Sequence, residues 1–253
     1  MRFFQNLKMK SKLIVIMTVP LLVFAVVLIS YLLKMSNDVK NAEKVNKLIG
    51  VISGISDVVH ETQKERGMTS GFLGSNGKLY GEELKIQRQV TDEKIKIFIN
   101  SSKKINVKEY GKDIEESYNK SINMINQLPD IRKKVDSFEI NTADAINFYN
   151  QMNDSTLRII EPISKISPDE KIFYHLKGYL MFLLAKERMG IERAVLNNAF
   201  SADKFNSGIF IKFSSLITKQ ELFIKEFKFY ASKNQKEYLE KNYKEKLLKK
   251  LKG

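Results

Sequence analysis

One arginine of this 253-residue chain falls on a helical stripe of apolar residues, where an unpaired charge is expensive to bury. Arg66 lies four residues after Thr62 and seven after Val59, so the three share one face of a helix. The same stripe continues back through Ile55 and Ile52. The guanidinium of Arg66 therefore needs an anionic partner.

Two kinds of partner fit this position. The first is a carboxylate, either from the neighbouring Glu61 or Glu65 or from another helix. The second is a small bound anion, because the planar fork of arginine donors engages two oxygens at once and stays charged at any relevant pH. The spacing alone leaves both interpretations open.

A second arginine follows the same pattern far along the chain, in the segment Ala185–Ala194. Arg193 shares a stripe with apolar residues, and Arg188 shares another. The Arg193 stripe contains Phe182, Ala185, Met189, Leu196 and Phe200, and the Arg188 stripe contains Met181, Leu184, Ile191 and Val195. We expect one of these arginines to point inward. Two inward guanidiniums would repel each other, and a small anion between them would relieve that repulsion.

The sequence offers little for catalysis, for a metal or for a cofactor. There is no cysteine, and the two histidines, His60 and His175, are isolated from each other and from any Glu at metal-binding spacing. The glycines between Gly67 and Gly81 lack the Gly-Lys-Ser/Thr ending of a phosphate loop. We expect no catalytic residue, no metal and no cofactor.

An uncharged apolar run of 21 residues, 13–33, predicts a transmembrane helix, since about 1.5 Å per residue spans a hydrocarbon layer of roughly 30 Å. Residues 1–12 carry four positive charges and no acidic residue, which places them in the cytoplasm. Residues 34–253 then form a periplasmic domain of a single-pass protein of the inner membrane. A cleaved signal peptide is the alternative, but no small-x-small cleavage site follows the run.

The exported part is predicted to be all-α, an antiparallel arrangement of packed four-helix bundles. Apolar residues recur every three or four positions, and turn signals separate the helices. The first helix is expected to end near Gly67, and a later one to stop before Pro129. Asn141 and the Ser167–Glu170 capping box are expected to start helices. The predicted helices are 82–102, 108–127, 130–137, 142–160, 168–198, 203–232 and 235–252.

Two segments of the chain resemble the nitrate- and nitrite-sensing (NIT) domain family. Thr62–Ser75, with Gln63-Lys64-Glu65-Arg66-Gly67, is similar to the family's Q-x-E-R-G run after a membrane helix. Gly190-Ile191-Glu192-Arg193-Ala194 is similar to its later G-x-E-R-A run. The resemblance covers about residues 45–246.

This resemblance implies a helical sensor in which Arg66 and Arg193 hold a nitrate or nitrite ion. Arg188, Thr62, Thr69 and Ser70 are secondary candidates. It also implies a homodimer that forms the input part of a chemotaxis receptor or a sensor kinase, although the second membrane helix of such a receptor does not follow by Gly253. A truncated receptor and a stand-alone anchored sensor both fit this ending.

Other functions fit the charge pattern less well. The net charge of +14 suggests nucleic-acid binding. Many lysines, however, lie near a Glu at helical spacing, as on an ordinary solvated helix face. Residues 233–253, near the expected membrane surface, alone hold eight Lys against three Glu. We therefore expect the partners to be a small anion and the membrane, with no nucleic acid. An anchored helical scaffold, or a sensor of a different small ligand, is the alternative.

Overall fold

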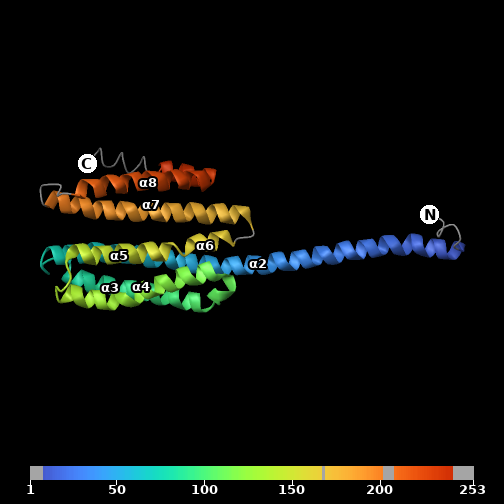
Figure 1. Ribbon diagram of the computed structural model, residues 1–253, viewed down its shortest axis with the longest axis horizontal. Coiled ribbons are helices and arrows are strands. Elements are labelled where there is room, and N and C mark those ends of the chain that lie inside the picture. The colour runs from blue at the N-terminus through green and yellow to red at the C-terminus, as the bar shows by residue number, and fades with distance from the viewer. Residues whose placement is uncertain (1–7, 167–168, 202–207, 242–253) are drawn as a thin grey trace. The chain divides into compact units, whose positions relative to one another are not determined.

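The computed structural model describes residues 8–166, 169–201 and 208–241, and these residues form helices and connecting turns without a strand. The all-α prediction is confirmed for this part of the chain (Figure 1). The helices are α2 (Met9–Gly74), α3 (Gly81–Lys103), the short 3-10 helix η1 (Val107–Tyr110), α4 (Lys112–Asp136), α5 (Thr142–Leu157), α6 (Ile160–Lys165), α7 (Glu170–Ser201) and α8 (Ile209–Tyr230). Residues 233–241 are also helical.

The chain divides into two units, Met1–Lys47 and Leu48–Gly253. The described part of the first unit belongs to α2, and its apolar side chains between residues 13 and 33 are largely exposed. Among the described helices, α2 alone is long and apolar enough to cross a membrane by length and composition. The membrane topology expected from the sequence stays a prediction.

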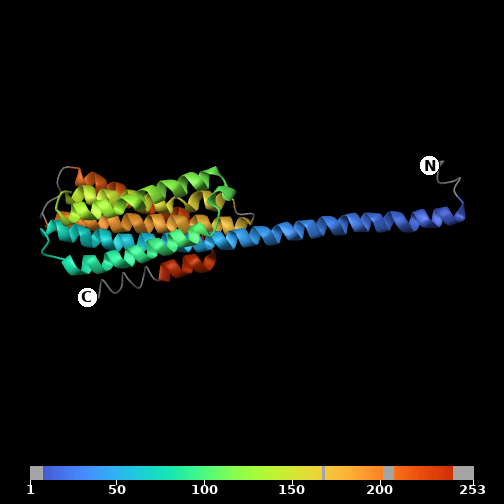
Figure 2. The same ribbon diagram turned by 90° about the horizontal axis from the view of Figure 1, so that it is seen from below.

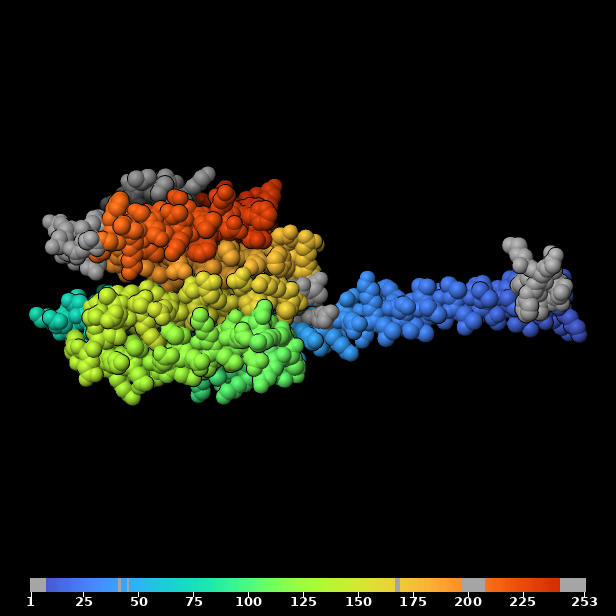
Figure 3. All heavy atoms as spheres, viewed as in Figure 1, coloured from blue at the N-terminus to red at the C-terminus, as the bar shows by residue number. Residues whose placement is uncertain are grey.

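The second unit contains the core, which the end of α2 shares with the helices around it. Figure 1 shows α5 and α6 between the α7–α8 pair and the α3–α4 pair, and the space-filling view shows α7 and α8 packed over the α5–α6 layer (Figure 3). Figure 2 shows α3 and α4 on opposite sides of α2 from below. The largest fully buried side chains come from α2, α3, α4, α5, α6 and α7 and include Ile55, Phe98, Leu128, Tyr149, Ile163 and Leu180.

Helix α2 continues past Gly67 to Gly74, so the prediction that it ends near Gly67 was wrong. The turn follows instead at residues 75–80, where Asn76, Gly77 and Tyr80 have positive φ angles. Gly71 is there for close packing, because a Cβ on it would lie 2.5 Å from the Tyr80 ring. A glycine in a helical sequence can mark the end of the helix or a close contact. Gly71 allows the close contact with Tyr80 and does not end α2.

Helix α4 runs unbroken through Pro129, which corrects the expected division into helices 108–127 and 130–137. An interior proline costs a helix about 3 kcal/mol. Leu128 and Val135, on either side of it, are fully buried, and each such side chain contributes about 1.5–3 kcal/mol. Tertiary packing thus outweighs the local signal.

Two helix-start signals have different outcomes. Asn141 caps α5 as predicted, since its Oδ1 accepts a 2.9 Å hydrogen bond from the Asp144 backbone N–H. The capping serine and proline before α7 lie outside the described residues, as do the restart expected after Ser201 and the end of the last predicted helix. The described α7 begins at Glu170.

A buried ionic cluster fastens α2 to three neighbouring helices. Glu65 is fully buried, and its carboxylate accepts two hydrogen bonds from Arg132 of α4, from Nε at 2.7 Å and from Nη2 at 2.8 Å. Tyr149 of α5 donates its hydroxyl to the same carboxylate at 2.7 Å, and Arg132 also pairs with Asp92 of α3 at 2.6 Å. Burial alone would lower the pKa of Arg132, but the hydrogen bonds and charge of Glu65 reverse this and raise it.

We predict that Arg132→Met destabilises the protein by about 3–5 kcal/mol, because it leaves the buried Glu65 carboxylate without its cation. Arg158→Met is the matched control, since Arg158 is exposed and pairs with Asp154, four residues before it. Removing this exposed pair should lower the free energy of unfolding by under about 1 kcal/mol. Urea unfolding followed by circular dichroism measures both. Equal losses in the two variants would contradict the structural role of the cluster.

Candidate functional site

The side chain of Arg66 is buried, at 3% exposure, where α2 meets α5 and α7. Its Nη1 forms an ion pair with Glu187 Oε1 of α7 and donates a 2.6 Å hydrogen bond to Asn150 Oδ1 of α5. The sequence left two partners open, a carboxylate or a small anion, and the structure has a carboxylate from another helix in contact with Arg66.

The carboxylate of Glu187 is fully buried, and both of its oxygens are engaged by α2. Oε1 is bound by Arg66, and Oε2 accepts a 2.5 Å hydrogen bond from Gln63 Nε2. Gln63 and Arg66 stand three residues apart and therefore project toward the same neighbouring helix. Together they form a two-point site for a planar oxyanion.

Gly190 lets α7 come close to the guanidinium of Arg66. A Cβ at position 190 would lie 2.8 Å from Arg66 Nη2, which is closer than two such atoms can approach. The two motifs of the sequence analysis therefore do meet in space. Their contact runs through Glu187 and Gly190, one helical turn before Arg193.

The contacts between α2 and α7 also fix the direction of the pair. Lys186 Nζ lies 3.2 Å from His60 Nδ1, Gln63 contacts Glu187, and Arg66 lies against Gly190, so residue numbers rise together along both helices. The two helices are therefore parallel. In this register Arg193 stands near the level of Ser70.

Arg193 itself is exposed, so the expectation that it points into the bundle is wrong for this structure. The buried stripe of α7 is the other one, with Leu184, Ile191 and Val195. Arg188 was placed on that stripe, and it forms a 2.8 Å ion pair with Asp154 of α5. On the stripe of Arg193, Ala185 is buried, but Phe182 and Met189 are 36% and 37% exposed. Both stripes are apolar, and the sequence did not distinguish which one the neighbouring helices cover.

The three hydroxyl candidates on α2 differ in burial and in hydrogen-bond partners. Thr62 is buried against α5, with its Oγ1 2.5 Å from Asn153 Oδ1 and 2.9 Å from the Val58 carbonyl. Thr69 is buried one turn after Glu65, and its Oγ1 makes no hydrogen bond among the described groups. Ser70 is half-buried, four residues after Arg66 and on its side of α2.

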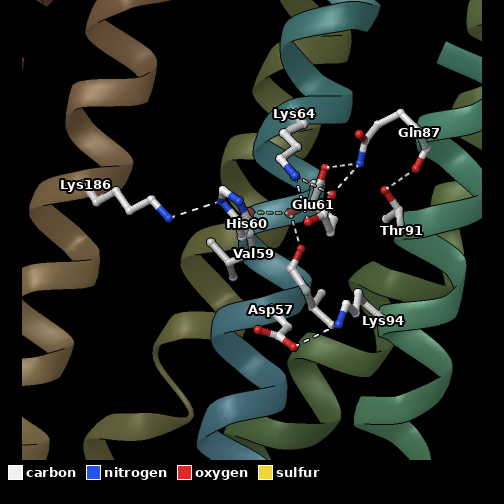
Figure 4. A network of polar contacts seen from close by, with 11 residues as sticks. Asp57, Val59, His60, Glu61, Lys64, Gln87, Thr91, Lys94 and Lys186 are labelled. Atoms are coloured by element: carbon white, nitrogen blue, oxygen red, sulfur yellow. Dashed lines mark hydrogen bonds and ion pairs between the residues drawn. The ribbon is translucent and has the colours of Figure 1, made fainter. Parts of the chain in front are cut away.

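Cations gather beside this site on α2 and α7 (Figure 4). Figure 4 shows Lys186 reaching from α7 to His60, with Glu61 beside His60 and Lys64 one turn further along α2. Burial lowers the pKa of Lys186, the charge of Glu187 opposes this, and Lys64 and Arg193 lower it further. Burial and then Lys186 also lower the pKa of His60. Lys64 is paired with Glu61 at 2.9 Å, while Lys186 reaches His60 and stands beside the α2–α7 contact.

Sequence reasoning missed three residues of the site. Gln63 stood inside the first motif and Glu187 three residues before the second, and neither was assigned a role, although a carboxylate at that helical spacing from Gly190 is a readable signal. Asn150 carries no such signal, because its place beside Arg66 depends on how α5 packs against α2.

The fold and the site define an all-helical domain in which two parallel helices meet at a buried arginine. The chain belongs to the nitrate and nitrite sensing family, NIT, whose family model matches residues 57–250. It is 26% identical over 163 residues to a protein of Klebsiella oxytoca named nitrate regulatory protein, and the match covers 62% of this chain and 40% of that protein.

The fold is also found in a solved structure titled the NasR transcription antiterminator. The two share a TM-score of 0.75 and 22% sequence identity over 78% of this chain and 53% of that one. The chain therefore spans about half the length of the relatives it matches. At this identity the likeness establishes a shared fold.

We predict that Gly190→Ala destabilises the protein relative to Gly178→Ala by about 1–3 kcal/mol, because the added methyl group collides with a guanidinium that Glu187 holds in place. Gly178 is the matched position on the same helix, since its Cβ would meet Tyr230 at an ordinary 3.4 Å. Thermal unfolding compares the two variants. Gly190→Ala as stable as Gly178→Ala would show that Arg66 is free to move aside.

Proposed function

We propose that this chain is a membrane-anchored sensor that binds nitrate or nitrite at Arg66. The observation that carries the proposal is the buried guanidinium at the place where the two motif segments meet, in a chain of the nitrate and nitrite sensing family. Arg66 supplies the charge and Gln63 a second donor. Arg193, one turn beyond Gly190 on α7, supplies the second cation when its side chain turns toward the site.

The small size of the ligand follows from the chemistry of this contact. Arg66 Nη1 and Gln63 Nε2 are placed to bind two oxygens of one planar group, as they do for the Glu187 carboxylate. Nitrite has two such oxygens, and nitrate has three. Lys186, next to Glu187 on α7, adds positive charge in the same region.

The anchor in this proposal is the apolar segment 13–33 of α2. Its apolar side chains are exposed, and basic residues precede it. The N-terminus would lie in the cytoplasm and residues 34–253 in the periplasm, in a homodimer that forms the input of a chemotaxis receptor or a sensor kinase. Because α2 contains both the anchor and Arg66, a shift of α2 against α7 on anion binding is the proposed signal. Its size is limited by the anion's difference in affinity for the two states.

We predict that nitrate binding weakens by about tenfold or more in Arg66→Gln, since a charge-assisted hydrogen bond to a buried arginine is worth about 1.5–3 kcal/mol. Arg193→Gln is expected to lose affinity in the same direction. Isothermal titration of the full chain in detergent with sodium nitrate, sodium nitrite and sodium chloride measures this.

Arg158→Gln is the control for this titration, because Arg158 is exposed and pairs with Asp154, and it makes no contact with Glu187 or Gln63 among the described interactions. Its affinity should equal that of the wild type. No nitrate or nitrite response above that of chloride in the wild type would refute the ligand, and an unchanged response in Arg66→Gln would refute the site.

The topology is tested with single cysteines, because the chain has none of its own. In intact cells a membrane-impermeant maleimide should label Ser36→Cys and leave Ser11→Cys unlabelled until the membrane is permeabilised. The two positions flank the apolar segment and carry the same substitution. Labelling of Ser11→Cys alone would reverse the topology, and equal labelling of both in whole cells would contradict a single membrane crossing.

A further inference from the structure

We infer that Glu187 is an internal competitor of the anion, occupying the oxyanion site of Arg66 and Gln63 until the ligand displaces it. This inference rests on the proposed function and assigns a regulatory role to a residue of the same site. In the absence of the anion, the carboxylate of Glu187 then makes the contact that joins α7 to α2.

The geometry of Glu187 is that of a bound ligand. Its carboxylate is fully buried, one oxygen is paired with Arg66 Nη1, and the other lies 2.5 Å from Gln63 Nε2. A carboxylate is a planar group with one negative charge over two oxygens, which is also the description of nitrite and of one edge of nitrate. Donors that satisfy the one satisfy the other.

Both anions cannot use these donors together. Two negative charges within about 4 Å of each other in a buried site disfavour each other strongly, and Arg66 brings one positive charge. Among the described residues, the two hydrogen bonds of Arg66 both come from Nη1, and Glu187 takes one of them. An anion that binds Nη1 and Gln63 must therefore move the carboxylate of Glu187 away.

Displacement of Glu187 by the anion would couple anion binding to the packing of α7 against α2. Glu187 is part of α7, so its release breaks a direct link between α7 and α2 and replaces it with a link through the anion. The cost of breaking that link lowers the apparent affinity, because an anion binds the fraction of molecules whose arginine is free. Removing the competitor should raise that affinity.

The test is nitrate titration by calorimetry on the full chain in detergent, comparing wild type with Glu187→Gln and Glu192→Gln. Glu187→Gln keeps the shape of the side chain and removes its charge, and nitrate should bind it about tenfold or more tightly than the wild type. Glu192→Gln removes one charge from the same helix, at a residue that hydrogen-bonds Gln220 of α8, and it reports the general effect of charge.

Glu187→Asp is the second variant. It keeps the charge but shortens the reach to Arg66, so displacement predicts tighter nitrate binding, and a purely electrostatic effect predicts no change. If Glu187→Gln unfolds, Glu187→Asp and the nitrate-induced rise in melting temperature of each variant give the same comparison.

The outcomes separate the two proposals. Nitrate binding in the wild type with no gain in Glu187→Gln beyond that of Glu192→Gln overturns the competitor and leaves the sensor. Absence of nitrate and nitrite binding in the wild type and in both Glu187 variants overturns the sensor, and the competitor with it. A gain in Glu187→Gln that is lost again in the double variant with Arg66→Gln is the result we expect.

Discussion

The structure depends on the cost of burying two adjacent opposite charges, Glu65 and Arg66, on one turn of α2. Neither can be left unpaired in a core, and because they are neighbours on a helix they point in different directions. Glu65 is satisfied by Arg132 and Tyr149, and Arg66 by Glu187 and by Asn150. Each charge thereby ties α2 to a different set of helices. The pairing fixes where α4, α5 and α7 stand around α2.

The two clusters differ in what they can do. Arg132 binds both oxygens of Glu65 and also contacts Asp92, so that cluster is closed and its function is to hold the bundle. The Arg66 cluster joins α2 to α7 through one carboxylate that also contacts Gln63, beside cations that raise the local positive potential. An anion from solution has the same chemistry as that carboxylate, so this cluster can exchange its partner. Both clusters pair an arginine with a glutamate. Their different surroundings make one a structural ion pair and the other a proposed ligand site.

Several expectations from sequence failed where a local signal competed with packing. Gly67 was interpreted as the end of a helix, but α2 continues to Gly74, and Gly71 within it admits the ring of Tyr80. Pro129 was interpreted as a boundary, but the burial of Leu128 and Val135 keeps α4 intact. Arg193 was expected inside because its stripe is apolar, yet the covered stripe of α7 contains Ile191 and Val195. In each case the residue's own preference was weaker than the area that its neighbours buried.

The sequence by itself determined the helical class of the described chain, the Asn141 cap and the family, since these follow from periodicity, from local hydrogen bonding and from the two motifs. It also marked Arg66 as a charge in need of a partner. Only the tertiary structure decided that the partner is Glu187, that Gln63 shares it and that Gly190 makes room for the guanidinium of Arg66. The reason is physical: a helical stripe specifies which residues turn inward, but the neighbour that meets them depends on how separate helices pack. That choice of neighbour puts a carboxylate of α7 where the proposed anion would bind.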